Sequence, residues 1–95
     1  MSEKLEDLTV SYSEDGIETT RELGKVILSK GSWTTIIFRY QDWDRAKEDY
    51  GPEKYTIRRY QKRNGEYRQQ SKFNISSRAQ AKAIIDALQG WIQEE

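Results

Sequence analysis

Hydrophobic and polar residues alternate through the middle of the chain, in short segments that are separated by turn residues. These segments are rich in β-branched and aromatic residues, which favour β-strands. The connections between them are too short for crossovers, so neighbouring strands are expected to run antiparallel. We predict four strands in a meander, at residues 23–29, 34–43, 54–62 and 66–75.

Near the C-terminus the spacing of apolar residues changes to that of a helix. Ser77 is the expected N-cap, and Gln80 three residues later completes a capping box. An apolar stripe follows at helical spacing: Ala81, Ile84, Ile85, Leu88, Trp91 and Ile92. The pattern therefore predicts an α+β fold, a four-stranded antiparallel β-meander followed by one C-terminal α-helix packed on one sheet face (β-β-β-β-α).

The turn between the last two strands decides which of their side chains share a face. A two-residue Asn64–Gly65 turn would mix apolar and basic residues on both faces, which a half-buried sheet avoids. A three-residue Arg63–Gly65 loop, with Gly65 left-handed in a bulge, separates the two kinds of residue, so we predict that loop. The apolar set that takes the helix is then Tyr55, Ile57, Phe73 and Ile75.

The second predicted strand offers two alternate sets of side chains. The better core set is Ile36, Phe38 and Tyr40. Trp33 and Arg39 belong to the other set and would join the basic residues on the uncovered face. Ile37 in that same set is unexpected on an open surface, and it indicates that the face is partly covered or binds a partner with apolar surface.

A formal net charge of zero hides a strong segregation of charge along the chain. Residues 1–22 carry seven acids and two bases, and residues 54–82 carry nine bases and one acid, so their net charges are −5 and +8. We predict that residues 1–22 are an acidic, largely disordered segment with at most a short ordered piece around Leu5 to Tyr12, and that residues 23–95 form the folded domain. The acidic segment could fold back over the basic face and compete there with nucleic acid.

The predicted basic face combines cations with aromatic rings. Such a surface suits single-stranded nucleic acid, because cations neutralise phosphates and rings stack on bases. Its residues are Trp33, Arg39, Arg58, Tyr60, Lys62, Arg68, Gln70 and Lys72. The sequence thus predicts non-catalytic binding of single-stranded DNA or RNA, with DNA favoured. A solvated face without a ligand and a contact with an acidic protein partner are the alternatives.

Several function classes are disfavoured by the residue types that are missing. The chain has no cysteine and no histidine, which removes thiol catalysis and also the commonest general base and transition-metal ligand. The acidic stretch "DWDRAKEDYG" fails the calcium-loop pattern, since Ala46 stands where an oxygen ligand belongs. We therefore expect no enzyme, no metal, no cofactor and no small-molecule substrate. No apolar stretch has the length of a signal peptide or a membrane span, so we expect a cytoplasmic protein without a membrane partner.

The order of elements, together with "GKVILSKGSW", "YTIRRYQK" and "SKFNISSRAQAKAIIDAL", resembles the family of the transcriptional coactivator positive cofactor 4 and the wider Whirly-type single-stranded DNA-binding fold. The resemblance covers roughly residues 23–92. It implies a homodimer whose sheets grip single-stranded or melted DNA without catalysis, as a transcription or DNA-maintenance cofactor. The small core also favours a homodimer, as does a stripe of small residues on the predicted helix: Ala79, Ala83 and Ala87.

The stretch "RQQSKFNISSRAQAKAIIDAL" is also similar to the last strand and helix of the arm-binding domains of tyrosine recombinases. Those domains place a sheet in the major groove of duplex DNA. The extra strand "GKVILSKG" and the long acidic loop fit that family less well. Duplex binding is therefore the alternative to single-stranded binding.

Overall fold

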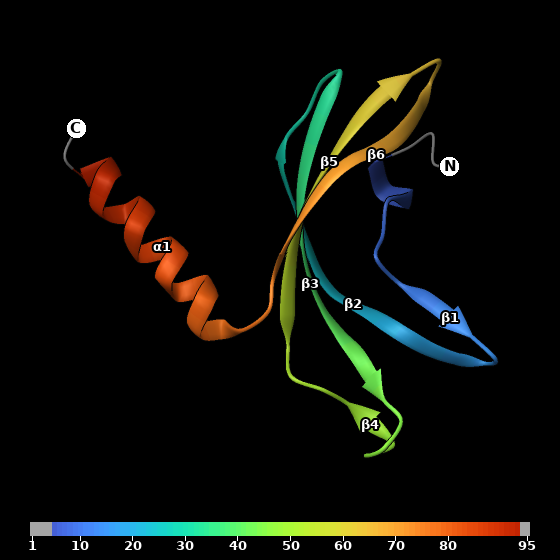
Figure 1. Ribbon diagram of the computed structural model, residues 1–95. Helices are drawn as coiled ribbons and strands as arrows, with labels where there is room; N and C mark the ends of the chain where they lie inside the picture. The colour runs from blue at the N-terminus through green and yellow to red at the C-terminus, as the bar shows by residue number, and fades with distance from the viewer. Residues whose placement is uncertain (1–4, 94–95) are drawn as a thin grey trace.

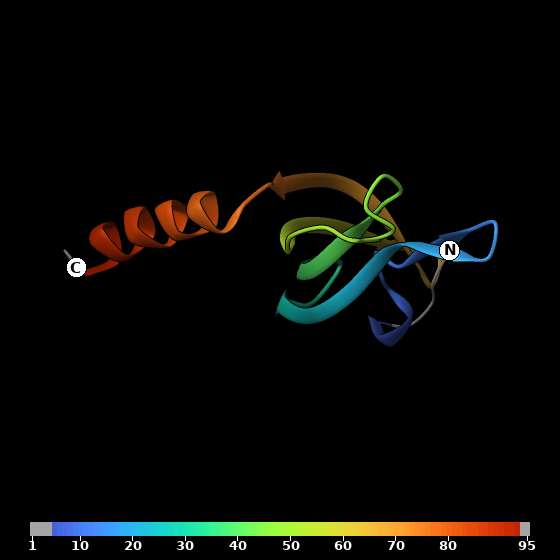
Figure 2. The same ribbon diagram turned by 90° about the horizontal axis from the view of Figure 1, so that it is seen from below.

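The computed structural model describes residues 5–93 of the chain. Its elements are, in order, the 3₁₀ helix η1 (Leu5–Asp7), the strands β1 (Tyr12–Glu14), β2 (Ile17–Ser29), β3 (Trp33–Asp44), β4 (Asp49–Tyr50), β5 (Lys54–Arg63) and β6 (Glu66–Ile75), and the helix α1 (Arg78–Gln93). All strand pairs are antiparallel, in the order β1-β2-β3-β5-β6, and β4 pairs with β3 outside this path. The protein is therefore α+β, as predicted, with a curled antiparallel sheet and one C-terminal helix (Figures 1 and 2).

The four predicted strands are present as β2, β3, β5 and β6, and they form the predicted meander. Two further strands, β1 and β4, enlarge the sheet. β1 and the start of β2 lie within residues 1–22, for which we expected little order. Asp15 and Gly16 between them have φ values of 52° and 80°, the geometry of a two-residue hairpin turn. Strand pairing through this turn orders residues 12–22 in spite of their acidic charge, while residues 1–4 lie outside the described part.

One face of the sheet is covered by residues 5–11, which we call the strap. Leu8 and Val10 of the strap are buried against this covered face, and together they form the main core: Leu8, Val10, Ile36, Phe38, Tyr60 and Tyr67. The Nζ atom of Lys25 donates hydrogen bonds to the carbonyl oxygens of Leu5 and Leu8, the latter at 2.7 Å. Full burial of an apolar side chain contributes roughly 1.5–3 kcal/mol, so the strap stabilises this face substantially.

The opposite face of the sheet, which we call the open face, carries four apolar side chains side by side. They cross β2, β3, β5 and β6 through the pairs Val26–Ile37, Ile37–Ile57 and Ile57–Phe73. We call these four residues the apolar row. The strap lies on the other side of the sheet, so it leaves the side chains of Val26 and Phe73 more than half exposed.

The turn between β5 and β6 differs from the predicted one. Arg63 pairs with Glu66, which leaves a two-residue turn at Asn64–Gly65. Asn64 and Gly65 have φ values of 52° and 79°, as a type I′ turn requires. The predicted three-residue loop is therefore wrong.

A bulge farther along the hairpin restores the separation of apolar and basic residues. The register shifts between Arg59 and Tyr60 of β5, where Gln70 is the additional residue on β6. Beyond the bulge the apolar residues share one face as predicted: Tyr55, Ile57, Phe73 and Ile75. Before the bulge the alternation along β6 is reversed, so Arg68 lies on the open face, whereas Lys72, beyond the bulge, lies on the covered face opposite Phe73.

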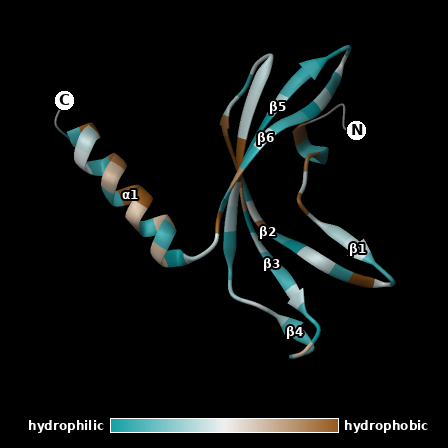
Figure 3. Ribbon diagram, viewed as in Figure 1, coloured by the Kyte–Doolittle hydropathy of each residue, from teal (hydrophilic) through white to brown (hydrophobic). Residues whose placement is uncertain are grey.

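The helix α1 has the predicted cap but not the predicted packing. The hydroxyl oxygen of Ser77 accepts a hydrogen bond from the backbone N–H of Gln80 at 3.1 Å, and the Gln80 side-chain oxygen accepts one from the backbone N–H of Ser76 at 3.0 Å. Beyond this cap the helix projects away from the sheet (Figure 1). None of the residues of α1 is buried, although several of them are hydrophobic (Figure 3). The strap, rather than the helix, covers the core.

Candidate nucleic-acid interface

The eight residues of the predicted basic face do not form a single surface. In the register of β3 on β5, Ile36 pairs with Arg58 and Phe38 with Thr56. Core residues of β3 therefore share the covered face with basic residues of β5. Trp33 and Arg39 take the alternate positions of β3 and lie on the open face.

Four of the predicted residues lie on the covered face: Arg58, Tyr60, Lys62 and Lys72. Tyr60 is only 5% exposed and belongs to the core, so its ring has no free face for a base. Burial raises the pKa of the Tyr60 hydroxyl above its usual value of 10.0, and the nearby charge of Arg58 opposes this effect. Arg58 donates a hydrogen bond from Nη1 to Gln69 at 3.1 Å, and Lys62 lies 5.5 Å from the centre of the Tyr67 ring. These side chains are largely engaged within the sheet itself.

A polar cleft of about 450 Å³ lies on the covered face between the strap and β6. Arg58 and Lys72 line it together with the hydroxyl groups of Ser11 and Thr20. The carboxylate of Asp42 also lines this cleft, so the positive charge there is partly offset.

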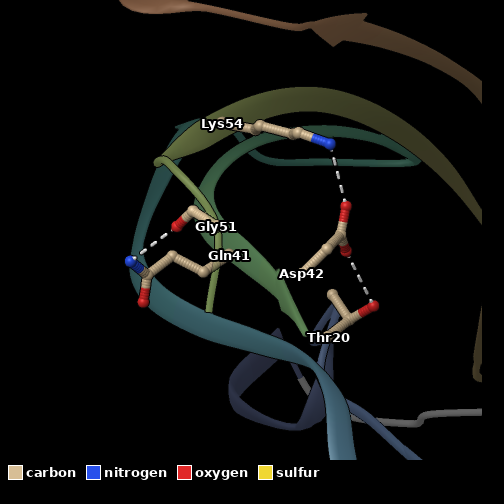
Figure 4. A network of polar contacts seen from close by, with 5 residues as sticks. All are labelled: Thr20, Gln41, Asp42, Gly51 and Lys54. Atoms are coloured by element: carbon tan, nitrogen blue, oxygen red, sulfur yellow. Dashed lines mark hydrogen bonds and ion pairs between the residues drawn. The ribbon is translucent and has the colours of Figure 1, made fainter. Parts of the chain in front are cut away.

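Asp42 belongs to the acidic stretch that we considered as a metal site, and it has a structural role instead. Its carboxylate accepts hydrogen bonds from Lys54 at 3.1 Å and from the hydroxyl of Thr20 at 3.2 Å (Figure 4). The neighbouring Gln41 donates from Nε2 to the carbonyl oxygen of Gly51 at 3.1 Å (Figure 4). These contacts hold the end of β3 to β2 and to the segment that leads into β5.

An exposed aromatic ring with several cations lies on the open face, near the turn between β5 and β6. Trp33 is 42% exposed, and the guanidinium carbon of Arg59 lies over its ring, 4.6 Å from the centroid. Trp33 pairs with Gln61, and Gln61 pairs with Arg68, so these residues form one cross-strand row. Gln61 in turn accepts a hydrogen bond from Nε of Arg63 at 3.1 Å. We call this group the Trp33 cluster: Trp33, Arg59, Gln61, Arg63 and Arg68.

Three members of the Trp33 cluster were missed by the sequence-based prediction: Arg59, Gln61 and Arg63. They alternate with Tyr60 and Lys62, so they share a face with Ile57. The pairing of Ile37 with Ile57 places these residues beside Trp33. The alternation of side chains along β5 could be read from the sequence, but the pairing of β5 with β3 could not.

Two other predicted residues lie outside the Trp33 cluster. Arg39 is on the open face toward the other end of β3, with its Nη1 atom 3.8 Å from a carboxylate oxygen of Glu53. Gln70 is exposed at the bulge of β6, where its amide donates a hydrogen bond to the carbonyl oxygen of Arg68 at 3.4 Å.

The Trp33 cluster keeps an excess of positive charge. Glu66 is the only acid between residues 54 and 82, and its carboxylate lies 3.8 Å from Nη2 of Arg68. Both side chains are partly exposed, so water and salt screen this ion pair strongly. Arg59 over the exposed ring, together with Arg63 and Arg68 beside Gln61, can therefore attract phosphates while the ring stacks on a base.

Residues 5–93 were predicted to hold no metal site and no membrane span. There, no three acidic, histidine or cysteine side chains gather closely enough to hold a metal ion. The described helices are also too short or too polar for one to cross a membrane.

Comparisons of the chain with models of known protein families, with curated proteins and with solved structures found no match. The resemblance to positive cofactor 4 therefore stays a prediction, as does the similarity to recombinase arm-binding domains. The geometry of the Trp33 cluster is the remaining basis for a function.

Proposed function

We propose that this protein binds single-stranded nucleic acid, with DNA favoured over RNA, through the Trp33 cluster and without catalysis. The observation that carries this proposal is the exposed ring of Trp33, with Arg59 over it and Arg68 in the same cross-strand row. Single-stranded nucleic acid offers both partners that such a group needs, because its bases are free to stack and its phosphates follow at regular intervals.

Each part of the Trp33 cluster has a distinct role in this proposal. The three arginines bind phosphates, and the free side of the Trp33 ring stacks on one base. Trp33 and Arg68 are two strands apart, which corresponds to roughly 10 Å at the usual spacing between strands. That distance is spanned by about three stacked nucleotides at roughly 3.4 Å each. A short single strand can therefore contact the ring and the outer arginines at once.

We also propose that the protein acts in the cytoplasm as a homodimer, in a cofactor role similar to that implied by the resemblance to positive cofactor 4. The shared order of elements, strands followed by one helix, supports this proposal. The exposed hydrophobic residues of α1 support the homodimer in particular, because they need a partner surface.

Fluorescence polarisation with labelled oligo-dT and with a duplex of equal length, measured across salt concentrations, tests nucleic-acid binding. We expect tighter binding to oligo-dT, with a slope of log affinity against log salt of about −2 if three phosphates are neutralised. Absence of binding to either probe at low salt would overturn the proposal. Tighter binding to the duplex would instead favour a mode like that of the recombinase arm-binding domains.

A further inference from the structure

Two hydrophobic surfaces of the molecule are left uncovered within residues 5–93. One is the apolar row of the open face, extended by Leu28, in which Val26 is 58% and Phe73 53% exposed. The other is a stripe along α1, which we call the helix stripe: Ile84, Ile85, Leu88, Trp91 and Ile92. Trp91 in the last turn is 68% exposed. Contiguous apolar surface of this kind marks a site of protein contact.

The two surfaces border the same cleft. The cleft has a volume of about 620 Å³, with Leu28, Ile37 and Ile57 on the sheet side. Ile84 and Leu88 line it on the helix side. An apolar cleft between a sheet and a helix accommodates another amphipathic helix, which would cover the row and the stripe together.

The helix of the same chain is poorly placed to cover its own apolar row. Its start is capped by the hydrogen bonds among Ser76, Ser77 and Gln80, and the helix projects away from the sheet (Figure 1). Trp91 lies 13 residues beyond Arg78, or roughly 20 Å along the helix axis. In this arrangement the end of the helix lies apart from the sheet of its own chain (Figure 1).

We propose that a second copy of the chain covers these surfaces, with α1 of each copy lying along the apolar row of the other. This inference deepens the homodimer proposed above and is independent of nucleic-acid binding. Each chain carries both an apolar row and a helix stripe. In a two-fold dimer the helix stripe of each copy can therefore cover the apolar row of the other, and the same contact occurs twice. A partner of another kind would need to supply two matching surfaces of its own.

The exposed apolar area suits a stable dimer. Seven side chains of the two surfaces are about half exposed or more: Val26, Leu28, Phe73, Ile85, Leu88, Trp91 and Ile92. If each contributes roughly 100 Å², a copy buries on the order of 700 Å², close to the ~800 Å² per partner of a standard interface.

The exchanged helices leave the Trp33 cluster accessible. Trp33 is four residues from Ile37 along β3, or roughly 13 Å. It lies toward the turn between β5 and β6, whereas α1 follows the opposite end of β6. Each copy can therefore present its own cluster outside the interface.

Cysteine cross-linking tests the exchange directly, because the native chain has no cysteine. Ile57→Cys places a thiol in the apolar row, and Leu88→Cys places one in the helix stripe. We expect a tagged Ile57→Cys chain and an untagged Leu88→Cys chain, refolded together and oxidised, to form a disulfide between the two chains. The absence of a disulfide between the two chains would overturn the inference. A second preparation carries both substitutions in one chain, and a disulfide that forms there only within single chains would also overturn it.

Analytical ultracentrifugation tests the exchanged helix contact separately from the existence of a homodimer. We expect a dimer for the native chain and a monomer for Leu88→Glu, with unchanged circular dichroism because Leu88 is not buried within one chain. Gln93→Glu, which has no stripe residue three or four positions before it and so lies off the stripe by helical periodicity, is the matched control and is expected to stay dimeric. A Leu88→Glu dimer would overturn the exchanged contact alone, and a monomeric native chain would overturn the homodimer as well. The affinity for oligo-dT is measured separately and decides nucleic-acid binding.

Discussion

Trp33 and Tyr60 show how the register of a sheet assigns different roles to two aromatic residues. They lie on neighbouring strands, and each has an arginine beside it. Tyr60 faces the strap and is part of the core, whereas Trp33 faces the open side with Arg59 over its ring. Of these two rings, only that of Trp33 has a surface that a base can reach.

Replacing Trp33 tests stacking separately from charge. We expect Trp33→Ala to weaken binding to oligo-dT by about 1–3 kcal/mol, because one stacked base is lost. The salt dependence should stay unchanged, since no cation is removed. Fluorescence polarisation measures both quantities. Tyr12→Ala, which removes another exposed ring on β1, is the control, and equal losses in the two variants would contradict the assignment.

The same measurement with an acidic peptide separates nucleic acid from an acidic protein partner. Such a peptide needs the arginines of the Trp33 cluster but offers no base to stack. Tight peptide binding that survives Trp33→Ala, with no binding of oligo-dT, would favour the protein-partner alternative.

Because of Tyr60, the unfolding free energy is expected to fall as the pH becomes alkaline. Because burial raises its pKa in the folded state above 10.0, the hydroxyl ionises first in the unfolded chain as pH rises. The resulting stability is fully present below pH 10 and is lost as pH rises through the folded-state pKa. We expect Tyr60→Phe to lose less unfolding free energy than the native chain when urea unfolding is compared below and above pH 10. Tyr12→Phe should follow the native chain, and a Tyr60→Phe variant that also follows it would contradict this account.

The bulge at Gln70 is the feature that gives the β5–β6 hairpin two consistent faces. The two-residue turn alone would place Phe73 and Ile75 on the side of Arg58. One additional residue on β6 exchanges the faces beyond the bulge, because side chains alternate with a period of two. Phe73 thereby joins the apolar row and Ile75 becomes buried.

Deleting Gln70 tests the role of the bulge. The deletion would turn Phe73 and Ile75 toward the covered face, and we expect it to cost at least ~1.5 kcal/mol of unfolding free energy, since the buried Ile75 loses its burial site and the half-exposed Phe73 leaves the apolar row. Gln70→Ala keeps the extra residue and should change stability by no more than about 0.5 kcal/mol. Urea unfolding of the two variants compares these effects, and equal stabilities would show that the bulge does not set the register.

Much of the architecture followed from local patterns, whereas the arrangement of the site depended on contacts between distant strands. The four long strands and the cap at Ser77 were predictable because alternation and capping are local. Ile36 and Ile37 look equally apolar in the sequence, so nothing local decided which of them pairs with Arg58. The pairing of Ile36 with Arg58 is what places Tyr60 in the core and Arg59 over the Trp33 ring. The position of the strap over the sheet was not predicted, since the acidic charge of residues 1–22 outweighed the few apolar residues of its ordered piece, Leu5, Leu8 and Val10.

The stability of the whole molecule should depend on its concentration. If each helix covers the sheet of a second copy, folding and association are linked and dilution favours the unfolded chain. We therefore expect the Tm of the native chain to rise with protein concentration. The Tm of Leu88→Glu should be independent of concentration. A native Tm that stays constant over a wide range of concentration would count against the dimer.

The central claim is that the open face, rather than the covered face, binds single-stranded nucleic acid. The most direct measurement compares two double variants that each remove two cations, Arg59→Ala with Arg68→Ala on the open face and Lys62→Ala with Lys72→Ala on the covered face. Titration of labelled oligo-dT across salt should show a large loss of affinity for the open-face pair, with the salt slope reduced in magnitude by about 1.4. The covered-face pair should keep the affinity and slope of the native chain. The opposite result, with binding lost only in the covered-face pair, would contradict the assignment of the Trp33 cluster.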